Sequence, residues 1–239
     1  MIWLVVAAIF LASYLLGAIP SGLLISKAHG MDIRKHGSRN IGATNVWRVM
    51  GKKWGVLAFL CDTAKGWLAV TLGVAIAARF PVTEQLLHGH TALRFFPPDF
   101  AGITAAIGCI LGHNFPVWLR FKGGKGVATS LGVIIGMMPL AALISFAIWG
   151  VVLKVSRYVS LASILAAACL PAVVIGLMLF GPAHGWAAVR VWGNFFFAVA
   201  AAALVIKRHT ANIQRLRAGT ELRFGTPKTE PQSPTDGPN

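Results

Sequence analysis

The hydrophobic positions of this chain fall into long apolar runs separated by short polar connections. Five runs, each long enough to cross a bilayer as one helix, cover residues 2–25, 55–79, 100–119, 159–180 and 186–206. A further apolar stretch, 127–153, is interrupted by Met138 and Pro139. It can form one tilted span or a short helical hairpin that turns at the proline. The pattern predicts an all-α, polytopic membrane protein.

The distribution of basic residues decides between the two forms of that stretch. Lysine and arginine concentrate in four connections, at 26–54, 120–125, 154–157 and from 207 onward. Basic connections remain on the cytoplasmic side of a membrane. All four can share one side only if the stretch 127–153 enters the membrane and returns to the same side as a hairpin. We therefore expect seven transmembrane segments, some of them short, with the N-terminus outside and the C-terminus cytoplasmic.

The amino-acid composition also indicates a membrane protein, and it distinguishes a membrane domain from a polar C-terminal tail. The 239 residues are 56% hydrophobic and 12% charged, which is too apolar for a soluble domain of this length. The first run is too long for the hydrophobic part of a signal peptide, so we interpret it as a retained span. Residues 1–225 form the predicted membrane domain, and 226–239, rich in Pro, Thr, Ser and Gly, are a predicted disordered tail.

The net charge of +15 narrows the expected partners. In a membrane protein such an excess favours anionic lipid or anionic substrates over nucleic acid. The three cysteines lie singly inside apolar runs and are expected to pack in the core. The seven carboxylates are scattered, so we expect no metal site and no cofactor.

A glycine-rich turn between two apolar runs is the first candidate for chemistry. Gly123, Gly124 and Gly126 alternate there with Lys122 and Lys125. Glycines allow successive N–H groups to converge, and a helix that starts near Gly126 adds the positive end of its dipole. Either lysine can supply a full charge. The turn predicts a cradle for phosphate, although a basic connection that only obeys the positive-inside rule has the same composition.

Two more polar patches lie in basic connections. The segment Gly37–Arg48 combines hydroxyl, amide and guanidinium groups with apolar residues, as expected for a loop that folds back over a polar cavity or for an amphipathic interfacial loop. After the last run, His209 and Asn212 are three residues apart and share a helix face. Arg208 and Arg215 beside them are expected to anchor this helix at lipid headgroups. Within the second run, Asp62 and Lys65 are spaced for structural pairing.

Together these patches resemble one family, the bacterial integral-membrane glycerol-3-phosphate acyltransferases that use acyl phosphate as donor. The matching stretches are Gly37–Arg48, Gly112–Gly132 and His209–Glu221, and the likeness extends from about residue 10 to 224. Arg39 departs from the pattern, which often has a small residue there. The resemblance implies a seven-helix fold and acyl transfer to the 1-hydroxyl of sn-glycerol 3-phosphate. It also implies release of lysophosphatidic acid and phosphate at the cytoplasmic face of the bacterial inner membrane, without thioester donors.

The residues suit that reaction, because acyl phosphate is already activated and needs mainly to be held and neutralised. We expect Ser38, Lys125 and His209 to be catalytic. The backbone of Gly123–Gly126 and Lys125 would hold the donor phosphate with help from Ser38. Arg48, His209 and Asn212 would hold the phosphate of glycerol 3-phosphate. The full set of expected substrate-binding residues is Asn40, Thr44, Asn45, Arg48, Lys122, Gly123, Gly124, Gly126 and Asn212.

Three questions stay open from the sequence. The general base is either His209 or a phosphate oxygen of the substrate. A transporter for organic anions or phosphate would also be polytopic and basic, although the sequence shows no internal repeat. A lipid-binding scaffold without catalysis is a third possibility. Besides the two substrates and membrane lipid, the enzyme that makes acyl phosphate is an expected partner.

Overall fold

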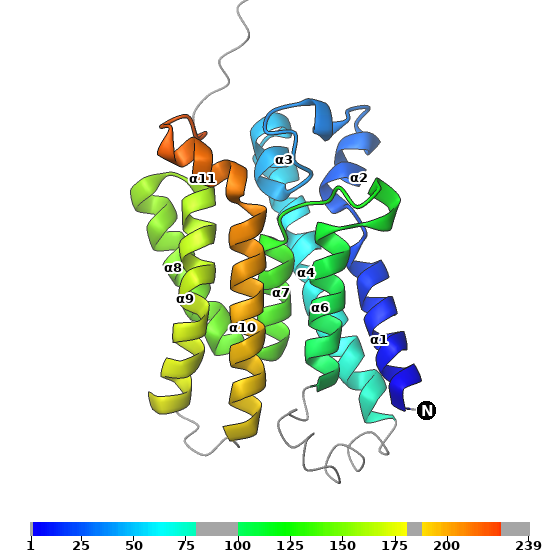
Figure 1. Cartoon of the computed structure of the whole chain (residues 1–239). Coiled ribbons are helices and arrows are strands. Elements are labelled where there is room, and N and C mark those ends of the chain that lie inside the picture. The colour runs from blue at the N-terminus through cyan, green and yellow to red at the C-terminus, as the bar shows by residue number, and fades with distance from the viewer. Residues whose placement is uncertain (1, 80–99, 181–187, 226–239) are drawn as a thin grey trace, which may run out of the picture.

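The structure is a computed structural model that describes residues 2–79, 100–180 and 188–225, and this part of the chain is helical without strands. Long helices form a bundle, and shorter helices gather at one of its ends (Figure 1). The bundle consists of α1 (Ile2–Gly17), α4 (Lys52–Ala78), α6 (Phe100–Asn114), α8 (Pro139–Ser156), α9 (Val159–Phe180) and α10 (Ala188–Arg208), together with the shorter α7 (Val127–Met137). The short helices at its end are α2 (Ser21–Ala28), α3 (Ala43–Met50) and α11 (Thr210–Arg217).

The predicted all-α membrane architecture is confirmed, but helix length supports fewer crossings than seven. Five described helices are long and apolar enough to cross a membrane, or six if the pair α10 and α11, bent by 58°, is one span. Helix α7 has only 11 residues. At about 1.5 Å per residue it reaches roughly half of the ~30 Å hydrocarbon core. The seven-segment topology therefore stays a prediction.

The turn expected at the proline is confirmed. Helix α7 ends at Met137, and α8 begins at Pro139, its first helical position. Proline is well suited to this position because the N–H it lacks would have no partner inside the helix. Met138 closes α7 with a hydrogen bond from its N–H to the carbonyl of Ile134 (2.6 Å). The apolar stretch 127–153 is thus two helices, as the hairpin interpretation required.

The basic connections lie at one end of the bundle. The segments around α2 and α3, the connection from α6 to α7, the turn between α8 and α9, and α11 are all at the end opposite the N-terminus (Figure 1). This arrangement agrees with the one-sided charge distribution expected from the sequence. The predicted tail, 226–239, lies outside the described residues, and so do the connections 80–99 and 181–187.

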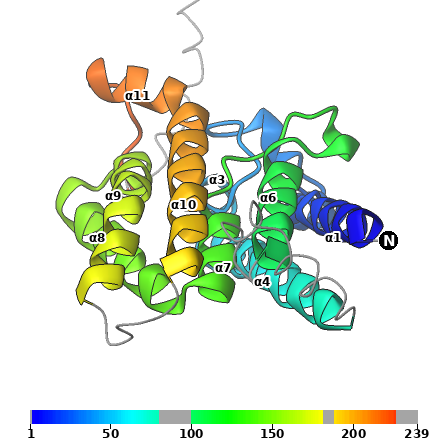
Figure 2. The same ribbon diagram turned by 60° about the horizontal axis from the view of Figure 1, so that its bottom comes forward.

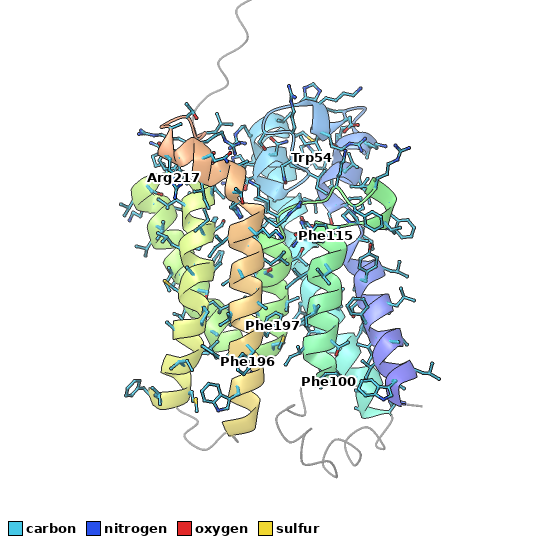
Figure 3. The ribbon with its side chains drawn as sticks, in the orientation of Figure 1. Trp54, Phe100, Phe115, Phe196, Phe197 and Arg217 are labelled. Atoms are coloured by element: carbon cyan, nitrogen blue, oxygen red, sulfur yellow. The ribbon has the colours of Figure 1, made fainter. Side chains whose placement is uncertain are left out.

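When the end that carries the N-terminus is turned toward the viewer, α1, α4 and α6 form one side of the bundle and α8 and α9 form the other. Helices α7 and α10 lie between them (Figure 2). The main core is where these helices meet, and it includes Val133 on α7 and Leu170 on α9. On α10, Phe197 is buried in this core at 5% exposure, while its neighbour Phe196 is 65% exposed (Figure 3). The outward apolar surface fits a lipid-facing helix.

Glycines bring α4 and α7 into very close contact. A Cβ atom on Gly132 would lie 1.9 Å from the carbonyl oxygen of Thr63, and one on Gly66 would lie 2.3 Å from that of Thr129. Helices in membranes often associate through such small residues, because the backbones can then approach each other. The contact holds the N-terminal end of α7 beside the middle of α4.

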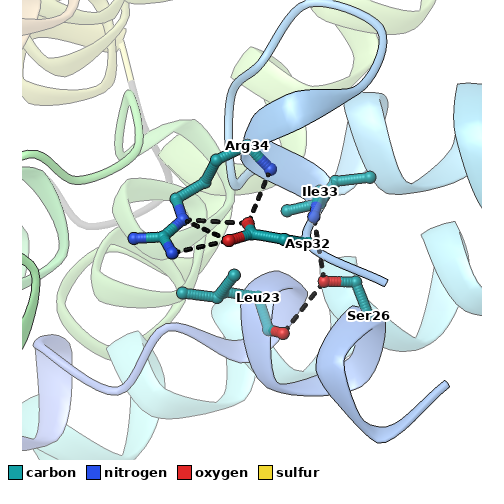
Figure 4. A network of polar contacts seen from close by, with 5 residues as sticks. All are labelled: Leu23, Ser26, Asp32, Ile33 and Arg34. Atoms are coloured by element: carbon teal, nitrogen blue, oxygen red, sulfur yellow. Dashed lines mark hydrogen bonds and ion pairs between the residues drawn. The ribbon is translucent and has the colours of Figure 1, made fainter. Parts of the chain in front are cut away.

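A second, smaller core supports the first basic connection. Leu23, Ile33 and Val46 belong to it, and Ser26 joins its two sides: the hydroxyl donates to the carbonyl of Leu23 (2.9 Å) and accepts from the N–H of Ile33 (3.4 Å) (Figure 4). At its surface Asp32 pairs with Arg34 at 2.6 Å. The hydrogen bond from the Arg34 side chain holds the pKa of the Asp32 carboxyl well below its ordinary value.

Candidate active site

A cavity of about 550 Å³ opens at the basic end of the bundle and extends between the helices. Its outer part is polar and is lined by the first connection, the start of α7 and the region of α11. Its inner part is apolar and is lined mainly by α7, α8, α9 and α10. The apolar lining includes Leu131, Ile134, Phe146, Trp149, Val159, Ala166, Leu170, Ala202 and Val205. Such a cavity suits a ligand with a charged head and a hydrocarbon tail.

Asn45 organises the first connection. Its side-chain oxygen accepts from the N–H of Ser38 (2.8 Å), and its amide donates to the carbonyls of Ile33, His36 and Asn40 at 3.3, 3.1 and 2.8 Å. The side chain is 2% exposed. Asn45 lines the cavity as expected, but its side chain is engaged by the loop, so a contact with substrate stays a prediction. Its structural effect is to hold Ser38 at the edge of the cavity.

The start of α3 presents the other expected groups of this connection. Asn40 accepts the N–H of Gly42 through its side-chain oxygen (2.8 Å), and Gly42 is the residue that caps α3. Thr44 and Arg48, on the same helix, also line the cavity. Burial lowers the pKa of Arg48 from its ordinary value, while nearby Glu221 opposes this effect. The guanidinium nevertheless stays charged, because its ordinary pKa is far above neutral.

The glycine turn is built differently from the expectation. The N–H of Gly123 donates to the carbonyl of Asn114 (3.2 Å) and that of Gly124 to the carbonyl of His113 (3.1 Å). These two N–H groups are therefore not available to a phosphate, and neither glycine lines the cavity. A Cβ atom on Gly124 would lie 2.1 Å from Nε2 of His113. Glycine is required here because the turn lies directly on the end of α6.

The residues that follow Gly124 do reach the cavity. Gly126 has φ +79 and caps α7, and Lys125, Gly126, Val127 and Ala128 line the cavity. The N–H groups of the first helical turn have no partner inside a helix. The positive end of the α7 dipole therefore faces the cavity beside Lys125. A phosphate cradle here stays a prediction, and the groups that could form it are Lys125 and the N–H groups of the first turn of α7 rather than those of Gly123 and Gly124.

Arg208 fixes the turn from the opposite side. Its guanidinium donates to the carbonyls of Gly123 (3.1 Å) and Gly124 (2.7 Å), and it lies 5.2 Å from the ring centre of Phe115. Phe115 is at the same end of the bundle, next to the turn (Figure 3). From the sequence, Arg208 was interpreted as a lipid-headgroup anchor, which this geometry corrects. The signal that could have found it is its position directly before His209.

Lys125 belongs to a polar network with the last helix. Its ammonium donates to the side-chain oxygen of Asn212, and the amide of Asn212 donates to Glu221 (2.6 Å). Glu221 also accepts from Ser160 (2.7 Å) and forms an ion pair with Arg215 (2.7 Å). Arg215 thus holds the network and is not a free headgroup anchor.

Burial and neighbouring charges change the pKa values in this network. Burial, together with the nearby charges of Arg215, Arg48 and Arg208, lowers the pKa of Lys125 to about 8 against the opposing effect of Glu221. For Glu221, burial raises the pKa, but hydrogen bonds from Ser160, Asn212 and Arg215 outweigh it, so the net shift is downward. The polar end of the cavity therefore keeps an excess of positive charge at neutral pH.

His209 lies between α10 and α11 and lines the cavity at 3% exposure. Its Nδ1 is 2.8 Å from the carbonyl oxygen of Val205. A carbonyl can only accept, so Nδ1 donates, and Nε2 of the neutral ring carries the lone pair. Asn212 follows three residues later and also lines the cavity. Both residues share the site, as their spacing predicted.

Of the expected residues, Lys122 lies apart from the cavity, as Gly123 and Gly124 do. It is exposed and does not line the cavity, whereas Lys125 does. Two further residues of the cavity wall, Asp62 and His113, were not among the expected site residues. Asp62 pairs with Lys65 at 2.9 Å, as its spacing predicted. Across the described ranges, no group of three or more His, Cys, Asp or Glu side chains is arranged to hold a metal ion.

Comparison with known proteins agrees with this site. A family model described as "Glycerol-3-phosphate acyltransferase" matches residues 7–219. The chain belongs to this family. Among its relatives is the glycerol-3-phosphate acyltransferase of Desulforudis audaxviator. That protein is 43% identical over 213 residues, which are 89% of this chain and 92% of the relative. Another, from Thermosynechococcus vestitus, is 45% identical over 216 residues (90% and 93%).

Solved structures of the same family have a similar fold. One is the glycerol 3-phosphate form of PlsY, an integral membrane glycerol 3-phosphate acyltransferase. It has a TM-score of 0.73 and 37% identity and covers 92% of this chain and 96% of that one. The lysophosphatidic acid form of PlsY has a TM-score of 0.71 and 38% identity. The resemblance deduced from the three polar patches is thus confirmed, and the chain is an integral membrane protein of this type.

Proposed function

We propose that this chain transfers a fatty acyl group from acyl phosphate to the 1-hydroxyl of sn-glycerol 3-phosphate, giving lysophosphatidic acid and phosphate. The observation that carries the proposal is a cavity with a cationic end and an apolar end. Both phosphates can enter the cationic end, while the acyl chain extends among the helices. Membership of the glycerol-3-phosphate acyltransferase family supports the acceptor.

The donor phosphate is assigned to the start of α7. The free N–H groups of the first helical turn and the ammonium of Lys125 face one region of the cavity, and Ser38 lies at its edge. This placement directs the acyl chain toward the apolar wall formed by Leu131, Ile134 and Leu170. Helix N-termini bind phosphate through such N–H groups and through the dipole.

The phosphate of glycerol 3-phosphate is assigned to Arg48, His209 and Asn212, with Asn40 and Thr44 beside them. The guanidinium of Arg48 makes no hydrogen bond to another described residue and remains available for a bidentate contact with phosphate. Binding of an anion also provides Lys125 with a stronger partner than the neutral oxygen of Asn212. Two anions can therefore be held side by side in a pocket with an excess of positive charge.

The reaction then requires little more than alignment. The hydroxyl oxygen bonds to the acyl carbon, the bond from that carbon to the phosphate oxygen breaks, and phosphate leaves with the electron pair. The hydroxyl proton passes either to Nε2 of His209 or to an oxygen of the departing phosphate. No covalent intermediate on the protein and no cofactor is required, because the mixed anhydride is already activated.

The orientation of the protein in the membrane is inferred from the distribution of its basic residues. We assign the basic end of the bundle to the cytoplasmic side of a bacterial inner membrane, with seven segments and the N-terminus outside. The donor then enters sideways from lipid and the acceptor from the cytoplasm. The enzyme that makes acyl phosphate is a fitting partner at that face. Cysteines introduced at Lys53 and Trp3 should be labelled from opposite sides of the membrane.

A direct assay tests the proposal. The purified protein is incubated with palmitoyl phosphate and glycerol 3-phosphate, and both free phosphate and lysophosphatidic acid are measured. We expect the two products in equal amounts, and none with palmitoyl-coenzyme A as donor. Uptake of glycerol 3-phosphate into proteoliposomes without phosphate release would instead identify a transporter. Absence of both would leave a binding role and reject the enzyme.

A further inference from the structure

His113 occupies a position in the cavity that the proposed mechanism does not yet use. It lies in the last turn of α6, is 5% exposed and lines the cavity. Its carbonyl holds the glycine turn through the N–H of Gly124 (3.1 Å). The ring is therefore placed directly beneath the residues that lead to Lys125.

Lys65 determines which nitrogen of this ring carries the proton. The ammonium lies 3.0 Å from Nδ1 of His113, donates to the carbonyl of Ile19 (2.7 Å) and pairs with Asp62 at 2.9 Å. An ammonium group can only donate, so Nδ1 must accept. Asp62 is 3.8 Å from the same nitrogen, which is beyond hydrogen-bond distance. The neutral ring therefore has its proton on Nε2.

That N–H faces the glycine turn without a protein acceptor. A Cβ atom on Gly124 would lie 2.1 Å from Nε2, so this nitrogen is in contact with the turn one residue before Lys125. Among the described residues, the hydrogen bond that His113 makes through its ring is at Nδ1. Because His113 lines the cavity, a ligand bound there can accept from this N–H.

We propose that His113 is a further catalytic residue, whose Nε2–H donates to the carbonyl oxygen of the acyl phosphate, and that Asp62 and Lys65 position it. The proposal rests on the acyl transfer described above. Negative charge develops on that oxygen when the hydroxyl attacks, and a fixed neutral donor stabilises it. His113 keeps its proton throughout: the hydroxyl proton goes to phosphate or His209, and phosphate takes the electron pair of the broken bond.

Two substitutions of similar size separate this role from packing. In His113→Gln the amide N–H₂ can reach the position of Nε2, whereas in His113→Asn it reaches only that of Nδ1. We expect His113→Gln to keep kcat within about fivefold of the unmodified protein and His113→Asn to lose about 100-fold, as for loss of one oxyanion donor. The KM for glycerol 3-phosphate should change less than threefold in both. Equal kcat losses in the two variants, or an Asn variant as active as the unmodified protein, would overturn the proposal.

The role of the positioning pair is tested in two backgrounds. Asp62 and Lys65 are replaced together (Asp62→Leu with Lys65→Met), so that no buried charge is left alone. The double substitution should lower kcat about tenfold when His113 is present, because nothing then keeps the ring proton on Nε2. It should have less than a twofold effect in His113→Gln, because an amide has no tautomer to fix. The same tenfold loss in both backgrounds would contradict the positioning role.

The assay distinguishes this proposal from the function on which it rests. Unmodified protein without acyl transfer would reject the proposed function, whatever the variants do. Glycerol 3-phosphate binding, followed as an increase in thermal midpoint, gives the structural control, since the acceptor site uses other residues. A His113→Asn variant that still binds the acceptor but turns over slowly supports the inference. One that loses binding and turnover together shows that His113 only holds the turn, and the inference fails.

Discussion

Two charged clusters lie on either side of the glycine turn, and they differ in how their charges are balanced. The inner cluster, formed by Asp62, Lys65 and His113, is buried to 5% exposure or less, and its one carboxylate matches its one ammonium. The outer cluster of Lys125, Asn212, Arg215 and Glu221 has two cations for one carboxylate and opens into the cavity. A balanced cluster holds helices together, whereas an unbalanced one has charge left for a ligand.

Gly124 joins the two clusters. Its N–H is bound by His113, its carbonyl by Arg208, and the next residue is Lys125. Any displacement of the inner cluster is therefore transmitted to the ammonium that faces the substrate. We expect damage to the outer cluster to lower turnover first. Displacement of Gly124 should lower both turnover and thermal stability, and loss of the Asp62–Lys65 pair should lower stability first.

The largest effect is expected for Lys125→Met. This change removes the ammonium that faces the donor phosphate, and kcat/KM should fall about 1,000-fold while the protein is still inserted and folded. Lys122→Met is the matched control, since Lys122 is three residues away, exposed and outside the cavity. Initial rates of phosphate release from palmitoyl phosphate measure both. Comparable losses in the two variants would mean that only the net charge of the turn matters.

Gly124→Ala should have the next largest effect. The new Cβ would meet Nε2 of His113 at 2.1 Å, so the turn must move away from α6. A displacement of this size near reacting groups costs about 100-fold in rate, and the thermal midpoint should fall as well. Gly150→Ala is the control, because a Cβ there meets nothing within 4 Å. A Gly124→Ala protein with normal rates would show that the two clusters are independent.

Asp62→Asn tests the inner cluster. It leaves the Lys65 ammonium without a counter-charge in a buried site, and loss of one partner of a buried pair costs about 3–5 kcal/mol, or roughly 10 °C in thermal midpoint. Asp32→Asn removes the exposed pair with Arg34 (Figure 4) and should leave the midpoint nearly unchanged. Thermal unfolding in the same detergent compares them. An equally small change in both would refute the structural importance of the buried pair.

The smallest effect concerns pH. The pKa of Lys125 is lowered to about 8, so the free protein loses this charge as pH rises through that value. The kcat/KM for acyl phosphate should therefore decline above pH 8, approaching a tenfold decrease per pH unit. Lys125→Arg keeps its charge, because a guanidinium has a pKa above about 12. Its lower activity should show no decline in the same range, and a decline identical to that of the unmodified protein would assign the titration to another group.

The sequence by itself determined the broad architecture and most of the site. The apolar runs and Pro139 specified the helices and the turn between α7 and α8, because burial in lipid requires long apolar segments with internally bonded backbones. The three polar patches specified the family. Ser38, Lys125, His209 and Asn212 were all named from their chemistry, and all line one cavity.

The tertiary structure decided what each group can do. Which N–H groups are free depends on the contact between the glycine turn and α6, and that contact joins residues whose spacing carries no signal. In the same way, the ammonium of Lys65 fixes the tautomer of His113 from 48 positions away in the chain. Hydrogen-bond partners are set by distance in space, so a sequence pattern can name a donor but cannot say whether another residue has already taken it.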